Sequence, residues 1–264
     1  MLGDPPDPQT NGSGLGAGGA VGSAAGASVG ASIGDHAAER PTPPPPLVEN
    51  TIDRIDREMI KLFALVGEGV AGATDSLLSG DRETARVLAE SDEMIDVLYR
   101  EIETLTQRQL VDGSQGSDQM RYLVAVLRML PELERSGDLA QHVASRAVRG
   151  LGTEMSHRAR GLVERMGELC SEMWRLTADS FADRSAENAD IVEELDDDLD
   201  HLHVTLTAEI ASGSMSLPVT IESALVARFY ERFGDHAVNL TRRIASLFGT
   251  PDRPAGIEGG SIGR

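Results

Sequence analysis

A five-residue pattern, Glu-Arg-x-Gly-Asp, occurs at residues 134–138 of this chain and again at residues 231–235. Both copies lie inside long segments whose apolar residues recur every three or four positions, which is the spacing of one face of an α-helix. The chain is therefore predicted to contain an internal repeat of helical units. Two more acids precede each copy, Asp92 and Asp96 in the first half and Asp196 and Asp200 in the second, and they map onto each other with an offset of 104 residues.

Short polar segments interrupt the helical pattern at 79–81, 112–118, 150–154, 182–185 and 212–218. Asp81 is predicted to cap the helix that follows it, because a carboxylate at this position accepts hydrogen bonds from the first free N–H groups. The fold class is therefore all-α, a tandem repeat of two three-helix bundles with antiparallel neighbours. The predicted helices span residues 47–79, 82–111, 118–149, 154–181, 184–211 and 217–247.

The two ends of the chain differ in composition from the helical part. The N-terminal segment is rich in Gly, Ala, Ser and Pro, so it buries too little apolar surface to offset the entropy lost on ordering. We expect it to be disordered, and we expect a second flexible tail at the C-terminus. The predicted organisation is a tail at 1–46, a first three-helix repeat at 47–150, a second at 151–248 and a tail at 249–264.

The formal net charge of −19 excludes whole classes of partner. So acidic a surface repels the phosphates of nucleic acids and lacks the basic patch that binds anionic membranes. No segment approaches the roughly 20 apolar residues of a membrane span, so no membrane insertion is expected. The single cysteine, Cys170, is predicted to be a buried core residue, and together these features favour a cytoplasmic protein.

The repeated acids occur as pairs spaced i, i+4, so the two members of each pair share a helix face. Two antiparallel helices that each carry such a pair could place four carboxylates around hard metal cations, which prefer oxygen ligands. Solvation of the acids on exposed faces is the alternative. The predicted ligand sets are Asp92, Asp96, Glu134 and Asp138 in the first repeat, and Asp196, Asp200, Glu231 and Asp235 in the second.

Several residues of the motif segments are predicted to support these sites. His142 and Asn239 follow the acid pairs by one helical turn and could ligate a metal or orient its ligands. Arg135 and Arg232 could offset part of the negative charge through ion pairs between helices. The repeated glycines, Gly137 and Gly234, predict close approach of a neighbouring helix.

The stretches "YERFGDHAVNLTRRI" and "LLSGDRETARVLAESDEMIDVLYREI", with Glu-x-x-x-Asp in each half, resemble the PhoU family over about residues 50–247. The resemblance implies a non-enzymatic adaptor that negatively regulates phosphate uptake and the phosphate-starvation response. It implies two partners, the PstB-type ATPase of the phosphate ABC transporter and a PhoR-type sensor histidine kinase, and a homodimer is expected. Some members of the family hold metal clusters on these carboxylates, so the cofactor could be Fe, Zn, Mg or Mn.

Two other functions are compatible with the sequence. A helical scaffold without metal would explain the same helices. A carboxylate-bridged metal enzyme needs paired Glu-x-x-His motifs, and the chain has one, Glu154 with His157. We therefore do not expect an enzyme. The acidic composition offers no evident anion pocket, so phosphate sensing is expected to reside in the transporter.

Overall fold

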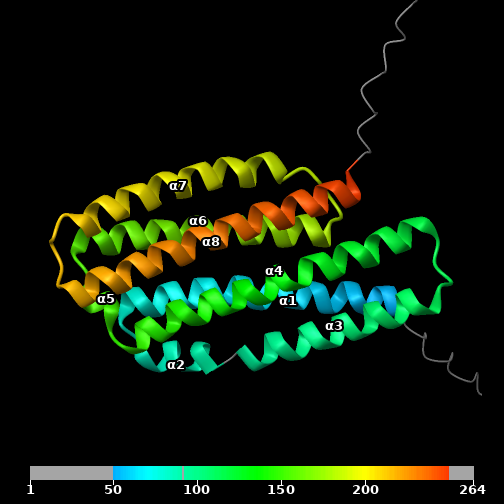
Figure 1. Ribbon diagram of the computed structural model, residues 1–264, viewed down its shortest axis with the longest axis horizontal. Coiled ribbons are helices and arrows are strands. Elements are labelled where there is room, and N and C mark those ends of the chain that lie inside the picture. Colours follow the sequence, from blue (N-terminus) through cyan, green and yellow to red (C-terminus); the bar gives the residue numbers. More distant parts are fainter. Residues whose placement is uncertain (1–49, 91, 250–264) are drawn as a thin grey trace, which may run out of the picture. The chain divides into compact units, whose positions relative to one another are not determined.

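A computed structural model of the chain describes residues 50–90 and 92–249, except for the side chains of Glu90 and Asp92. Within these ranges every regular element is an α-helix (Figure 1). None of these helices is long and apolar enough to cross a membrane. The elements are α1 (Thr51–Ser79), α2 (Arg82–Glu90), α3 (Asp92–Asp112), α4 (Ser117–Val148), α5 (Leu151–Glu154), α6 (His157–Ala182), α7 (Ala189–Ala211) and α8 (Leu217–Phe248).

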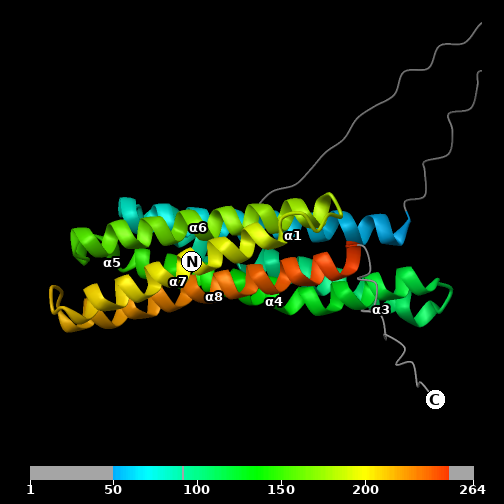
Figure 2. The same cartoon turned by 90° about the horizontal axis from the view of Figure 1, so that it is seen from above.

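The helices form two three-helix bundles, as the sequence predicted. In the first bundle α1 and the α2–α3 pair contact α4, and in the second α6, α7 and α8 contact one another. The bundles meet along two pairs of helices, α1 against α6 and α4 against α8, which are visible from two directions in Figures 1 and 2. The α4–α8 pair is antiparallel, because Glu132 contacts Arg243 whereas Arg146, further along α4, contacts Glu222. The long helices that carry the repeated motifs therefore lie at the junction of the two repeats.

Helix boundaries agree with the predicted ones except in two places. The helix predicted at 82–111 is described as α2 and α3, on either side of Ser91. The helix predicted to begin at 184 begins at Ala189, because Arg184 has a φ of 52°, which interrupts the helical conformation. The short helix α5 lies in the segment 150–154, where a connection was predicted. The predicted tail at 1–46 lies outside the described residues, and so does the C-terminal tail after Gly249.

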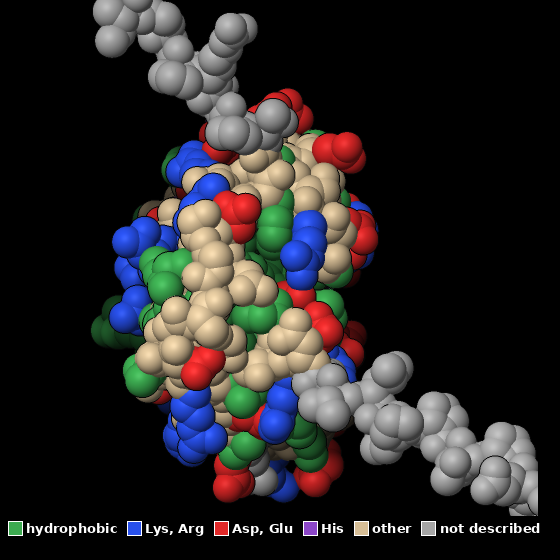
Figure 3. Space-filling model, turned by 90° about the vertical axis from the view of Figure 1, so that its right-hand side faces the viewer, with side chains coloured by type: hydrophobic (Ala, Val, Ile, Leu, Met, Phe, Trp, Pro, Cys, Tyr) green, Lys and Arg blue, Asp and Glu red, His purple; other side chains and the backbone are tan. Residues whose placement is uncertain are grey.

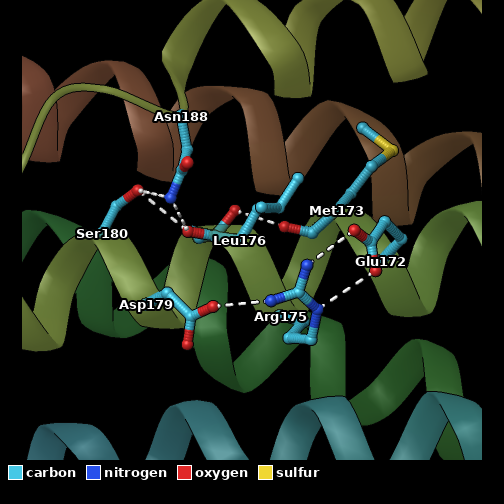
Figure 4. Close-up of polar contacts among 8 residues, drawn as sticks. Glu172, Met173, Arg175, Leu176, Asp179, Ser180 and Asn188 are labelled. Atoms are coloured by element: carbon cyan, nitrogen blue, oxygen red, sulfur yellow. Dashed lines mark hydrogen bonds and ion pairs between the residues drawn. The ribbon is translucent and has the colours of Figure 1, made fainter.

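The connection from α6 to α7 is held by side-chain hydrogen bonds (Figure 4). The amide Nδ2 of Asn188 donates to the carbonyl oxygen of Leu176 at 3.2 Å and to Oγ of Ser180 at 3.1 Å. On the exposed side of α6, the guanidinium of Arg175 lies between the carboxylates of Glu172 and Asp179. The Asn188 contacts fix where α7 begins relative to α6, and so help to set the register of the acids on α7.

The core is shared between the two bundles. The ring of Phe63 on α1 lies 6.3 Å from that of Trp174 on α6, and Trp174 in turn meets the edge of Phe233 on α8 at 5.7 Å. The hydroxyl of Tyr230 and that of Thr74 are hydrogen-bonded at 2.7 Å, which ties α8 to α1. Cys170 is fully buried in this core, as predicted, and burial raises the pKa of its thiol. The bundles are therefore one packed unit.

The predicted cap of α2 is also confirmed. Oδ1 of Asp81 accepts hydrogen bonds from the backbone N–H groups of Glu83 and Thr84, each at 3.1 Å. The hydroxyl of Thr84 adds a bond to Oδ2 at 2.7 Å. These bonds stabilise the charged form, so they lower the pKa of Asp81.

Candidate functional site

The repeated glycines are positions where neighbouring helices come very close. A Cβ atom placed on Gly137 of α4 would lie 2.7 Å from Cδ1 of Ile95 on α3. A Cβ atom on Gly234 of α8 would lie 2.5 Å from Cδ2 of Leu199 on α7 and 2.6 Å from Oδ1 of Asp196. Both distances are too short for a side chain, so the predicted close approach is confirmed. The missing side chains allow the acidic helices, α3 and α7, to lie directly on the motif helices.

In the second repeat this approach crowds carboxylates together. Burial raises the pKa of Asp196 on α7 to about 6, and repulsion from Asp200, Asp235 and Glu231 contributes to the shift. These four side chains are the predicted second ligand set. Arg228, one turn before Glu231, forms an ion pair with it. The remaining acids face one another with little positive charge between them, so a cation at this place would relieve their repulsion.

In the first repeat, two of the predicted ligands, Asp96 and Asp138, are shown to interact within the described residues. Burial raises the pKa of Asp138, the positive form of His142 opposes this shift, and Asp96 adds to it. Asp96 itself forms an ion pair with Arg100 on the same helix. Glu134 lies near Tyr99 of α3 and contributes to raising the pKa of that phenol, after burial and Glu103.

The fourth predicted ligand of the first repeat, Asp92, has a side chain outside the described residues. The described part of this set is therefore Asp96, Glu134 and Asp138, with positive groups close by. Each set contains an acid that forms an ion pair, Asp96 with Arg100 and Glu231 with Arg228, and in the first repeat His142 also lies near Asp138.

A protein-family model described as "PhoU domain" matches the chain at residues 59–147 and 163–244, which together exceed half of its length. The two matched segments correspond to the two helical repeats. The chain belongs to the PhoU family.

Curated relatives agree with this assignment. The "Phosphate-specific transport system accessory protein PhoU homolog 1" of Thermotoga maritima is 27% identical over 203 residues, which are 74% of this chain and 86% of that protein. The PhoU homolog of Rhizobium meliloti is 27% identical over 195 residues, 72% of this chain and 82% of the relative. Proteins so named are accessory proteins of phosphate-specific transport.

Solved structures of the family have the same fold. The crystal structure of PhoU from Pseudomonas aeruginosa aligns with a TM-score of 0.70 and 25% identity, and covers 75% of this chain and 96% of that chain. The phosphate transport system regulatory protein PhoU from Streptococcus pneumoniae aligns with a TM-score of 0.67 at 23% identity, over 74% and 93% of the respective chains. The second comparison supports the fold alone.

The donor chemistry of the PhoU motif fits a hard cation better in the second repeat than in the first. Asp196, whose pKa is raised by burial and by neighbouring acids, is a group that a bound cation would stabilise in its charged form. Among the described residues, however, no three acidic, His or Cys side chains are already close enough to share one metal ion. Metal binding would therefore require the carboxylates of α7 and α8 to change rotamer and converge.

The two motif arginines do not have the role predicted for them. Neither Arg135 nor Arg232 forms an ion pair with any residue in the described ranges. Instead, both lie near His236, whose ring is buried between α4 and α8 and whose Nδ1 is hydrogen-bonded to Oγ of Ser136 at 2.8 Å. Burial, reinforced by the charges of Arg232 and Arg135 and opposed by Asp235, lowers the pKa of His236 to about 4. The neutral ring therefore connects one copy of the motif to the other.

The two residues one turn after the motifs differ in their surroundings. The ring of His142 stacks on that of Phe229 at 5.3 Å and also lies near Asp138. Asn239 lines a groove between α4 and α8. The groove also contains Arg121, Arg128, Arg242 and Arg243, a concentration of positive charge that the acidic composition did not indicate.

Sequence reasoning missed this groove because it forms between helices from different repeats. The available signal was the seven-residue spacing of Arg121 and Arg128, which puts both on one face of α4. That spacing does not reveal that the neighbouring helix face carries Arg242 and Arg243. The pairing of α4 with α8 was needed to bring the four guanidinium groups together.

Proposed function

We propose that this chain is a non-enzymatic adaptor that represses phosphate uptake and the phosphate-starvation response when phosphate is plentiful. The observation that carries the proposal is the match of both repeats to the PhoU domain, in a family whose named relatives are accessory proteins of phosphate-specific transport. An adaptor needs two binding surfaces, and two bundles packed against each other supply quasi-equivalent surfaces in one unit.

The proposed partners are the PstB-type ATPase of the phosphate ABC transporter and a PhoR-type sensor histidine kinase in the cytoplasm. By binding both, the adaptor would hold the kinase in its inactive or phosphatase state while transport proceeds. A homodimer is part of the proposal. It is supported by an exposed apolar stripe on α8, where Leu217, Ile221 and Leu225 are 71%, 53% and 39% exposed at a spacing of one helical turn.

Metal binding by the repeated carboxylates is proposed as the element that stiffens the adaptor. Asp196, Asp200, Glu231 and Asp235 would hold the ion in the second repeat, and Asp92, Asp96, Glu134 and Asp138 would hold one in the first. Fe, Zn, Mg and Mn are the candidate ions, since carboxylates bind all of them. A bound cation would neutralise the crowded acids and fix α7 against α8. The crowding around Asp196 supports this proposal.

To test the regulatory role, the gene is returned to a strain that lacks it. The activity of a reporter driven by a phosphate-transport promoter is then measured at high phosphate concentration. The native chain is expected to repress the reporter. The quadruple variant Glu134→Ala, Asp138→Ala, Glu231→Ala, Asp235→Ala is expected to lose repression and, when purified without an affinity tag, to lose metal by elemental analysis.

A matched control replaces four exposed acids outside the motifs, Glu83, Asp112, Glu164 and Glu187, by Ala, which changes the net charge equally. It should keep repression and metal. If the native chain itself does not repress, the regulatory proposal is wrong. If the quadruple variant represses fully and the native protein holds no metal, the metal proposal is wrong and the protein is a helical scaffold without metal.

A further inference from the structure

We propose that the arginine-lined groove between α4 and α8 binds a multivalent phosphate anion, such as a nucleoside diphosphate or an inorganic polyphosphate. The groove has a volume of about 580 Å³, within the range of roughly 300–1,000 Å³ typical of small-ligand pockets. It is lined by Met120, Arg121, Val124, Ala125, Arg128, Asn239, Arg242, Arg243, Ser246 and Leu247.

The charge of the lining is opposite to that of the chain. Four of the lining residues are arginines and none is acidic, whereas the whole chain has 43 acids and 24 basic residues. By comparison, the groove between α1 and α6 is lined by Asp75, Glu164, Glu168 and Glu172 with a single arginine. In the end view of Figure 3, Lys and Arg side chains lie along the left-hand edge with hydrophobic side chains between them.

Part of this positive charge is not used by the protein itself. Arg128 is exposed and has no ion pair within the described residues. Arg243 pairs with Glu132 at 2.7 Å, but its Nε is buried without an acceptor. Arg242 pairs with Glu193 at 2.6 Å, and both side chains are about half exposed, so this pair contributes little and can exchange for a ligand.

The four arginines of the groove, Arg121, Arg128, Arg242 and Arg243, do not arise from the sequence repeat. At the other end of the antiparallel α4–α8 pair, Arg146 occupies the place equivalent to Arg243. There the guanidinium of Arg146 pairs with Glu222 at 2.9 Å and covers the ring of Phe229 at 4.7 Å, although its Nε, like that of Arg243, has no hydrogen-bond acceptor among the described residues. The place equivalent to Arg128 is held by Leu225, so Arg128 has no counterpart at that end.

The type of ligand follows from the chemistry of the groove. Guanidinium groups form paired hydrogen bonds with phosphate oxygens, and several of them spread over two helices suit an anion with more than one phosphate. Asn239 and Ser246 add neutral donors. Met120 and Val124, each 37% exposed, provide an apolar surface against which a nucleoside could lie. A ligand here would contact α4 of the first repeat and α8 of the second, and would therefore bridge the two repeats.

The experiment is calorimetric titration of the purified full-length chain at fixed ionic strength in a phosphate-free buffer. The probes are ADP, tripolyphosphate and inorganic phosphate, with sulfate as a charge control. At least one of the first two should bind saturably with a stoichiometry near one per chain. If ADP binds more tightly than tripolyphosphate, the apolar surface contributes; the reverse order indicates recognition of phosphate groups alone.

Two variants test the position of the site. Arg128→Gln with Arg242→Gln should lower the affinity about tenfold or more, because two charge-assisted contacts are lost. Val124→Glu introduces a negative charge at a half-exposed position and should have a similar effect without removing an arginine. Circular dichroism and urea unfolding show whether each variant is folded.

The matched control is Arg86→Gln with Arg165→Gln, two exposed arginines that also pair with exposed acids and lie away from the groove. It should change the affinity by less than about twofold. The proposal is wrong if neither ADP nor tripolyphosphate binds saturably, or if binding falls equally in the control. Binding of an acidic helical peptide at the groove, with no binding of the phosphate compounds, would also overturn it. The measurement needs no transporter or kinase, so its result is independent of the proposed regulatory role.

Discussion

The two repeats place the same acid pair on equivalent helices, yet the surroundings of the acids differ. In the second repeat Asp196 lies against Gly234, and burial together with its carboxylate neighbours raises its pKa. In the first repeat Ile95, the counterpart of Leu199, contacts Gly137, and Arg100 and His142 lie close to the acids; the side chain equivalent to Asp196 is outside the described residues. The motif therefore fixes how the helices approach, while the neighbouring residues decide how much negative charge remains.

This difference teaches that a repeated motif does not guarantee repeated chemistry. The close approach of α3 to α4 and of α7 to α8 depends on a glycine, which both copies retain. Cation affinity depends on the sum of nearby charges, which changes with every substitution around the motif. We therefore expect the second repeat to bind a cation more tightly than the first.

The largest expected effect concerns metal affinity. The variant Asp196→Asn with Asp235→Asn should weaken binding of Mn²⁺, used as a probe, by about tenfold or more, because two carboxylate ligands lose their charge. The corresponding variant Asp92→Asn with Asp138→Asn should weaken it by less than about threefold. Calorimetric titration of chelator-treated protein measures both. Equal losses in the two variants would show that the repeats are equivalent as cation sites.

The next effect concerns the glycines. Gly234→Val should lower the free energy of unfolding by about 3 kcal/mol and Gly137→Val by about 2 kcal/mol, because overpacking a tight helix contact costs roughly 1–3 kcal/mol. Among the described side chains, Gly234 has two close neighbours on α7, Leu199 and Asp196, whereas Gly137 has Ile95 on α3.

Urea unfolding of metal-free protein measures both glycine effects. Gly161→Val is the control, since nothing lies within 4 Å of a Cβ at that helical position. The control should be neutral or slightly stabilising. A loss of stability in the control as large as that of Gly234→Val would attribute the effect to valine in a helix rather than to the contact with α7.

The smallest effect is a pH dependence of stability. In the metal-free protein the folded state holds the Asp196 proton with a pKa of about 6, above the ordinary value of 3.8. Ionisation of Asp196 therefore lowers the free energy of unfolding progressively as the pH rises from 3.8 to 6. Above pH 6 this loss of stability stays constant. Asp196→Asn should raise the free energy of unfolding by about 1–2 kcal/mol at pH 7.5, after allowance for partial solvent exposure, and by less than half of that at pH 4.5.

The comparison with the first repeat sharpens this prediction. Asp138→Asn should give a smaller gain at pH 7.5, since among the described residues Asp96 is the one carboxylate that adds to burial in raising the pKa of Asp138, whereas several acids act on Asp196. Urea unfolding at the two pH values measures both variants. A gain for Asp196→Asn that is the same at pH 4.5 and pH 7.5 would rule out ionisation of the carboxyl as its cause.

Much of the candidate site was predictable because its signals are local or periodic. The cap at Asp81, the helical repeat and the close approach at Gly137 and Gly234 were each inferred from spacing, and the structure confirms them. The start of α7 was not, because Arg184 adopts a left-handed conformation and the helix restarts from contacts of Asn188 with α6. Both ligand sets stay predictions until metal is measured.

By itself, the sequence determined the helices, their grouping into two repeats and the placing of acid pairs on one face of each motif helix. These features follow from periodicity along a single segment. Only the tertiary structure decided that α4 packs against α8, that Ser136 meets His236, and that four arginines share one groove. The reason is physical: such contacts join residues about a hundred positions apart, and no pattern within either segment encodes which face of the other helix it will meet.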